Sequence, residues 1–265
     1  MEKLPSDVSD AYQNLANDPK YQHFVRIPDR IIQCIDYFGI ACDRATARTR
    51  LHAYYLFIGV VDDAIDSGRL DAGRLILDYL SRPAAEFDDE TRRSSVRLIT
   101  EILKVYISDR TYPAIMDKLR ELYSEVVSER SATSVDAYIV HRKSVGALTA
   151  ELSYLLIHPG LSGDNEKLCD FMKQVGAIGC LIDSVIDLNT DHRLGLLAFH
   201  SGVMDYAKLM VAILRNGLRV SLRHPRLYGL FFRAVVDNLR DPFRAERIPR
   251  PPFARDRKDE AASVA

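Results

Sequence analysis

The sequence lacks a long hydrophobic run, a strong net charge and any paired cysteine motif. Its 265 residues include no tryptophan and only four cysteines, none in a CxxC pair, which predicts reduced thiols in a cytoplasmic protein. The formal net charge of -1 gives no electrostatic reason to expect a nucleic acid partner. The longest apolar stretches are well short of the roughly 20 residues that a transmembrane helix needs, which leaves only a peripheral membrane contact open.

The strict alternation of apolar and polar residues that is typical of strands is also missing. Apolar residues recur at helical spacing instead, which predicts an all-α protein. The expected helices are 29–41, 44–66, 70–80, 91–107, 113–128, 134–157, 166–190, 203–222 and 226–240. Pro28 and Pro113 suit first-turn positions, and Ser134 suits an N-cap. Because no fixed-period repeat is visible, we expect one helical-bundle domain over residues 1–241, as a monomer or homodimer, and a disordered Pro- and Arg-rich tail over 242–265.

Asp62, Asp63 and Asp66 follow the apolar run YYLFIGVV at the C-terminal end of a predicted helix. Carboxylates there oppose the helix dipole and repel one another. Mg²⁺ would compensate, because it prefers hard oxygen ligands and fills its remaining sites with phosphate and water. The alternative is a solvated helix end.

A second acidic group, Asp183, Asp187 and Asp191, lies at i, i+4 and i+8 on one stripe of an otherwise apolar helix. Gly179 and Gly176 continue this stripe. Since glycine costs about 0.5–1 kcal/mol in a helix interior, both positions predict space for a bulky ligand. A close helix–helix contact through small residues is the alternative interpretation.

Arg142 and Lys143 are candidates for binding a diphosphate, Arg142 by a bidentate fork and Lys143 as a point charge. Gly146 shares a stripe of small and polar residues with Tyr138 and Arg142, whereas a solvated surface pair is the alternative for the two cations. Three further candidates are Arg193 for the diphosphate and Phe57 and Ile58 for an apolar pocket.

The two acidic motifs on separate helices resemble the class I isoprenoid synthase superfamily. Within it, YYLFIGVVDDAID is similar to the first motif of the squalene/phytoene synthase family, Y-x-F-x-R-x-V-D-D-x-x-D. Asp183 and Asp187 match the second motif of that family, D-x-x-x-D. The segment YIVHRKSVGALT resembles that family's tyrosine-and-VG helix at Tyr138 and Gly146. The resemblance implies a bundle around a central apolar pocket, with Mg²⁺ (two or three ions) held by Asp62, Asp66, Asp183 and Asp187.

The implied activity is Mg²⁺-dependent ionisation of an allylic prenyl diphosphate, followed by head-to-head coupling and release of diphosphate. NADPH would be needed only for a squalene-type reduction. The chain departs from the family pattern where Gly59 replaces an arginine and where Ile182 and Ile186 replace charged residues. These departures put diphosphate contacts in question.

Two other functions stay open. Asp183, Asp187, Asp191 and Gly195 match the spacing of the metal triad in bacterial terpene cyclases, and Arg142 resembles the arginine with which those enzymes sense diphosphate. That resemblance implies cyclisation of a single prenyl diphosphate. The third hypothesis is a non-catalytic binding or assembly protein, because some relatives of this fold have lost their metal sites.

Overall fold

The computed structural model describes residues 6–66, 72–81, 95–163, 165–193, 195, 197–199, 202–227 and 229. Over these ranges the chain is all-α: nine α-helices form a single bundle, and the only β-structure is an isolated bridge between Cys42 and Leu161. The helices are α1 (Ser6–Asn17), α2 (Gln22–Tyr37), α3 (Arg44–Asp66), α4 (Ala72–Ser81), α6 (Ser95–Tyr106), α7 (Tyr112–Arg130), α8 (Val135–Ile157), α9 (Glu166–Arg193) and α10 (Val203–Arg223). Short 3-10 turns occur at Pro19–Tyr21, His158–Gly160 and Pro225–Leu227. The all-α prediction is confirmed.

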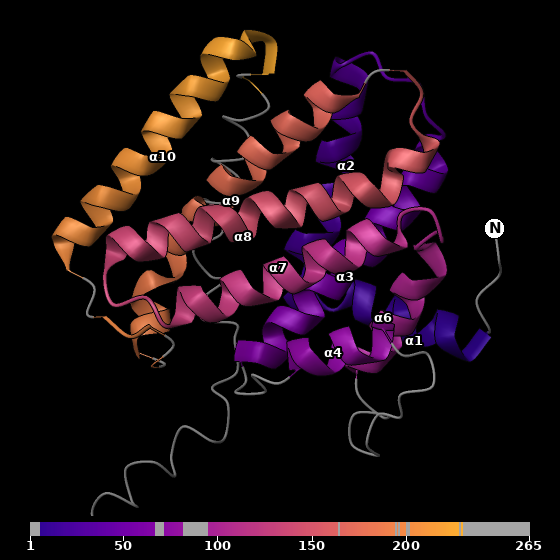
Figure 1. Cartoon of the computed structure of the whole chain (residues 1–265), viewed down its shortest axis with the longest axis horizontal. Coiled ribbons are helices and arrows are strands. Elements are labelled where there is room, and N and C mark those ends of the chain that lie inside the picture. The colour runs from indigo at the N-terminus through magenta and orange to yellow at the C-terminus, as the bar shows by residue number, and fades with distance from the viewer. Residues whose placement is uncertain are drawn as a thin grey trace, which may run out of the picture.

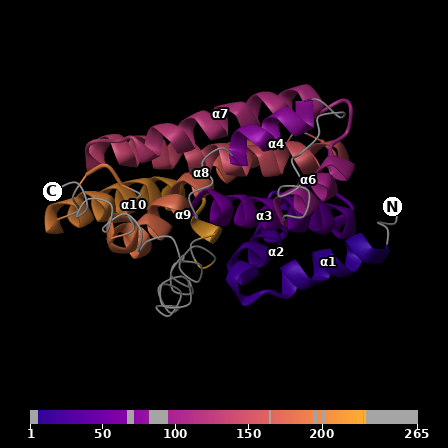
Figure 2. The same ribbon diagram turned by 90° about the horizontal axis from the view of Figure 1, so that it is seen from below.

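Helices α3 and α8 occupy the middle of the bundle. Helix α3 packs against α2, α4, α6 and α8, while α8 packs against α7, α9 and α10. Figure 2 shows α7 and α4 on one side of α3 and α1 and α2 on the other, and Figure 1 shows α10 at the outer edge beside α9. No helix in the ranges given above is long and apolar enough to cross a bilayer.

Side chains of α3 fix its position against α8. The hydroxyl of Tyr54 donates to the carbonyl oxygen of Thr149 at 3.0 Å, and Arg50 Nη1 donates to the carbonyl oxygen of Leu156 at 3.1 Å. Leu51 and Leu152 are fully buried in the same core. Both apolar packing and polar contacts therefore hold the helix that carries the first acidic motif.

The start predicted for the first helix is wrong. Pro28 lies inside α2 rather than in its first turn, because the helix begins at Gln22 after the Pro19–Tyr21 turn. The helix ends before residue 41, since Gly39 adopts a φ of 67° and the N–H of Ile40 donates to the carbonyl oxygen of Ile35. Helix α1 has no counterpart among the predicted helices.

Other boundary predictions are confirmed or lie outside the described residues. Pro113 stands at the N-terminus of α7, and the side chain of Ser134 accepts from the backbone N–H of Ala137 at the start of α8. Most of the predicted helix 226–240 and all of the predicted tail 242–265 fall outside the part that the structure describes.

The glycines Gly146 and Gly176 mark the contact between α8 and α9. A Cβ on Gly146 would lie 2.2 Å from the carbonyl oxygen of Gly176, and a Cβ on Gly176 would lie 2.3 Å from that of Gly146. These glycines let two helix backbones touch, which agrees with the alternative interpretation of a close helix–helix contact. By contrast, a Cβ on Gly179 meets no atom within 4 Å.

Candidate functional site

Charged residues from four helices meet at one end of the bundle. Asp62 comes from α3, Glu129 from α7, Arg142 from α8 and Asp191 from α9, and their charges interact with one another. Asp183 of α9 also interacts with Asp62. The fold thus brings the first and second acidic motifs together, as the sequence predicts.

Arg142 is held by a network of hydrogen bonds. Its Nη1 donates to Glu129 Oε1 at 3.2 Å, and its Nε donates to Ser184 Oγ at 3.1 Å and to the carbonyl oxygen of Cys180 at 3.3 Å. No residue in the described ranges accepts from Nη2. With 23% of its side chain accessible, Arg142 keeps one nitrogen available for an anion.

Tyr138 supports this network and does not reach the site directly. Its side chain is only 1% exposed, and its hydroxyl donates to Ser184 Oγ at 3.0 Å. Ser184 Oγ in turn donates to the carbonyl oxygen of Cys180 at 2.8 Å. Tyr138 therefore holds Ser184, the residue that accepts from Arg142, and its binding of diphosphate stays a prediction.

Glu129 is a component that the sequence did not reveal. Its carboxylate is buried, Oε1 accepts from Arg142, and Oε2 has no hydrogen-bond partner within the described structure. Burial raises the pKa of Glu129, and Arg142 opposes this rise. The segment SER at 128–130 looks like an ordinary polar helix end, and its one signal is an acid that opposes the helix dipole, as Asp62 does.

The acidic side chains of this cluster raise one another's pKa values. Protein around the carboxylate of Asp62 raises its pKa, although its side chain borders solvent, and Arg142 and Arg130 act in the opposite direction. Burial, together with the charge of Asp187, raises the pKa of Asp191 to about 7. A cation bound here would relieve this repulsion.

One predicted ligand forms its contacts elsewhere, and the side chains of two other predicted residues lie outside what the structure describes. Asp63 forms an ion pair with Lys20 and accepts from the hydroxyl of Tyr21 at 3.5 Å, so its predicted role as a metal ligand is not supported. Asp62 and Asp63 have different surroundings because the side chains of adjacent residues point about 100° apart around a helix. The side chains of Asp66 and Arg193 are outside the described residues.

Lys143 faces away from Arg142. It lines a separate groove between α8, α9 and α10 together with Lys173 and Arg219, so the predicted Arg142–Lys143 pair does not form. Gly59, which replaces the arginine of the family motif, packs against Phe24: a Cβ there would lie 2.5 Å from the phenyl ring. A larger side chain at position 59 would have to displace that ring.

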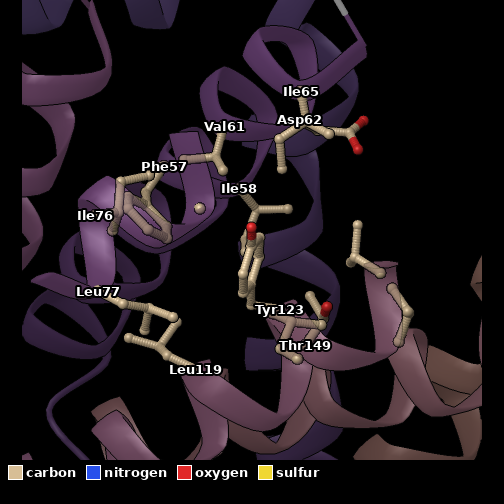
Figure 3. Close-up of a pocket in the computed structure, with 14 residues that line it drawn as sticks. Phe57, Ile58, Val61, Asp62, Ile65, Ile76, Leu77, Leu119, Tyr123 and Thr149 are labelled. Atoms are coloured by element: carbon tan, nitrogen blue, oxygen red, sulfur yellow. The ribbon is translucent and has the colours of Figure 1, made fainter. Parts of the chain in front are cut away.

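An apolar cavity of about 100 Å³ adjoins the charged cluster. Helices α3, α4, α7 and α8 line it through Phe57, Ile58, Val61, Asp62, Ile65, Gly73, Ile76, Leu77, Leu119, Leu122, Tyr123, Val126, Val145 and Thr149. Figure 3 shows the labelled apolar side chains around it, with the Asp62 carboxylate at its edge. The two predicted pocket residues Phe57 and Ile58 both line this cavity, and Asp62 connects it to the cluster.

The carboxylate oxygens of the cluster are ligands of the kind that magnesium prefers. All the acidic groups offer hard carboxylate oxygens, and Mg²⁺ commonly takes one or two of these while phosphate and water complete its shell. In the described ranges, no three Asp, Glu, His or Cys side chains are grouped closely enough to hold an ion by themselves. A substrate phosphate would therefore have to supply part of the shell.

No known protein family, curated protein or solved structure matches this chain. The family resemblance therefore depends on the motifs, and it stays a prediction.

Proposed function

We propose that this chain is a magnesium-dependent enzyme of the class I isoprenoid synthase type, which ionises an allylic prenyl diphosphate. One observation carries the proposal: Asp62 lies at the edge of an apolar cavity and interacts with Asp183 and Asp191 of the opposite acidic motif. A substrate with a hydrocarbon chain and an anionic head needs these two environments side by side. The squalene/phytoene-like motifs favour head-to-head coupling of two such substrates.

Asp62, Asp66, Asp183, Asp187 and Asp191 would hold the magnesium. When bound, the metal would neutralise the diphosphate and make it a better leaving group.

The chain's own residues contribute positioning and exclusion of water. Nη2 of Arg142 would donate to a diphosphate oxygen, while Glu129 and Ser184 keep the guanidinium in place. The allylic carbon–oxygen bond breaks heterolytically, and its electron pair leaves with the diphosphate. The apolar walls around Phe57 and Tyr123 would shield the resulting carbocation from water, and their aromatic faces favour a cation.

The size of the cavity supports the second candidate, cyclisation of one prenyl diphosphate. At about 100 Å³ the cavity is smaller than the roughly 300–1,000 Å³ of typical ligand sites, so it must widen for any prenyl chain. Accommodating one chain requires less widening than accommodating two.

The test is incubation of the purified protein and Mg²⁺ with geranyl, farnesyl and geranylgeranyl diphosphate separately, followed by mass analysis of extracted products. A product of doubled carbon number is expected for coupling, and one of unchanged carbon number would show cyclisation. Asp62→Asn should lower turnover by at least about 100-fold, because it removes a carboxylate ligand of the magnesium that would stabilise the leaving diphosphate.

Asp63→Asn is the matched control, because it makes the same change one residue later in an ion pair with Lys20. Its turnover should stay close to wild type. If both variants retain full activity, the carboxylates are not catalytic. Intact substrate in every reaction, without diphosphate release, would contradict the proposal and favour a non-catalytic binding role.

A further inference from the structure

A second cavity, of about 430 Å³, lies between α8, α9 and α10 and is cationic. Its lining residues are Val140, Lys143, Ser144, Ala147, Lys173, Gln174, Ala177, Ile178, Asn216, Arg219, Val220 and Arg223. Four of them carry positive charge, and none is acidic. We refer to this cavity as the cationic groove.

Most of this positive charge is uncompensated. Lys173 pairs with Glu151 at 3.4 Å. Lys143, Arg219 and Arg223 form no salt bridge with any residue that the structure describes. Three cations from two helices therefore share one groove without an anion, and a bound anion would lower their mutual repulsion.

Helix α10, which forms one wall of the groove, also exposes a row of large apolar side chains. Val203, Met204, Val211, Leu214, Leu218 and Leu222 are between 62% and 90% exposed. The intervals of three and four residues from Val211 to Leu222 place them on one face. Figure 1 shows α10 at the edge of the bundle, and we call this row the apolar face of α10.

The basic and apolar rows run next to each other along α10. Arg219 and Arg223 directly follow Leu218 and Leu222, so each arginine lies about 100° around the helix from a leucine. Arg215 extends the basic row toward the N-terminus. An amphipathic helix with apolar and basic sectors of this kind lies in the plane of an anionic bilayer surface.

We propose that the apolar face of α10 and the cationic groove form a docking surface for an anionic lipid bilayer, with a lipid phosphate bound in the groove. Charge complementarity favours this occupant over a second copy of the chain, because a symmetric contact would bring the arginine rows of two copies together. Charge complementarity also disfavours the following chain segment, 228–240, as the occupant. That segment has two arginines and one aspartate, so it is not acidic overall. The proposal does not depend on the activity proposed above.

The experiment is flotation of the full-length protein with phosphatidylcholine vesicles and with vesicles that also contain phosphatidylglycerol. Wild type should float only with the anionic vesicles. The double substitution Arg219→Gln with Arg223→Gln should weaken partitioning roughly 30-fold, since each basic residue near an anionic surface contributes about a factor of five. Arg26→Gln with Arg110→Gln removes the same charge from exposed positions in α2 and in the turn before α7, and it should leave partitioning unchanged.

A second pair of substitutions tests the apolar face. Leu214→Asn with Leu218→Asn should also abolish flotation, and circular dichroism should show intact helix content because both side chains are exposed. The proposal would be overturned if wild type did not float, or if it floated equally with neutral vesicles. It would also be overturned if the control pair lost as much flotation as the Arg219 and Arg223 pair, or if the protein bound inorganic phosphate but no vesicles. Concentration-dependent dimerisation that the leucine substitutions abolish would assign the apolar face to a second copy instead.

Discussion

The α8–α9 helix pair has two faces of opposite charge. On the inner face, Arg142 lies among Glu129, Asp62 and Asp191. On the outer face, Lys143 lines a groove in which no acidic residue takes part. Because these two cations are neighbours in sequence, the comparison shows that the helical rotation of one residue decides between the acidic cluster and the cationic groove.

The two faces also differ in how their charges are satisfied. Arg142 donates three hydrogen bonds within the protein, whereas Lys143, Arg219 and Arg223 form no salt bridge in the described ranges. The inner cation is thus part of the folded architecture, and the outer cations are available to a partner. This difference predicts different consequences when each charge is removed.

The largest effect on stability is expected for Arg142→Gln. Loss of the guanidinium leaves the buried carboxylate of Glu129 without a charged partner, which should lower the free energy of unfolding by about 3 kcal/mol. Lys143→Gln, one residue away on the outer face, should change it by less than about 0.5 kcal/mol. Urea denaturation of both variants measures the difference.

The double variant Arg142→Gln with Glu129→Gln identifies the cause. If the unpaired carboxylate is responsible, the second substitution should recover most of the lost stability, giving a coupling energy of roughly 1–3 kcal/mol. Additive losses would mean that Arg142 stabilises the fold mainly through Ser184 and Cys180. Equal losses in Arg142→Gln and Lys143→Gln would contradict the distinction between the two faces.

A smaller effect is expected from alanine at the glycines of this helix pair. Gly146→Ala places a Cβ 2.2 Å from the carbonyl oxygen of Gly176, so the backbones must separate, at a cost of about 1–3 kcal/mol. Gly179→Ala enters open space and should be neutral or stabilise the helix by up to about 1 kcal/mol. Thermal unfolding compares the two, and equal melting temperatures would refute the close contact between α8 and α9.

Most of the helices could be predicted from sequence because they depend on periodicity, whereas the meeting of the two acidic motifs was implied by the family resemblance. The predicted helix 44–66 coincides with α3, and carboxylates at helical spacing necessarily share a face. The roles of Lys143, Gly146 and Gly176 could not be predicted in the same way. Both sides of α8 are covered by other helices, so its pattern does not show which side holds the site.

Glu129 shows a second reason for the limits of prediction. Its partner Arg142 is thirteen residues away on another helix, so the contact depends on how α7 and α8 pack and not on a local pattern. The surroundings of Asp63 could not be predicted for a similar reason. Its ion pair with Lys20 joins segments far apart in the sequence, and no spacing within its own motif indicates that contact.

A further expected effect is a pH dependence of stability that originates at the inner face. Burial and Asp187 raise the pKa of Asp191 to about 7, well above its value in an unfolded chain. The folded state therefore binds this proton more tightly, so the contribution is favourable at acidic pH and is lost as pH rises from about 4 through about 7. Asp191→Asn removes this contribution and should flatten the decline in melting temperature between about pH 4 and about pH 7.

Magnesium provides the matching control for this prediction. A cation held by the inner carboxylates favours the ionised form of Asp191, so adding Mg²⁺ with inorganic diphosphate should restore wild-type stability mainly at the alkaline end of the range. The same addition should have little effect on Asp191→Asn. Without metal, parallel profiles of melting temperature against pH for wild type and variant would mean that Asp191 ionises as readily as an exposed carboxylate. The inner face would then lack the charge crowding that distinguishes it from the outer groove.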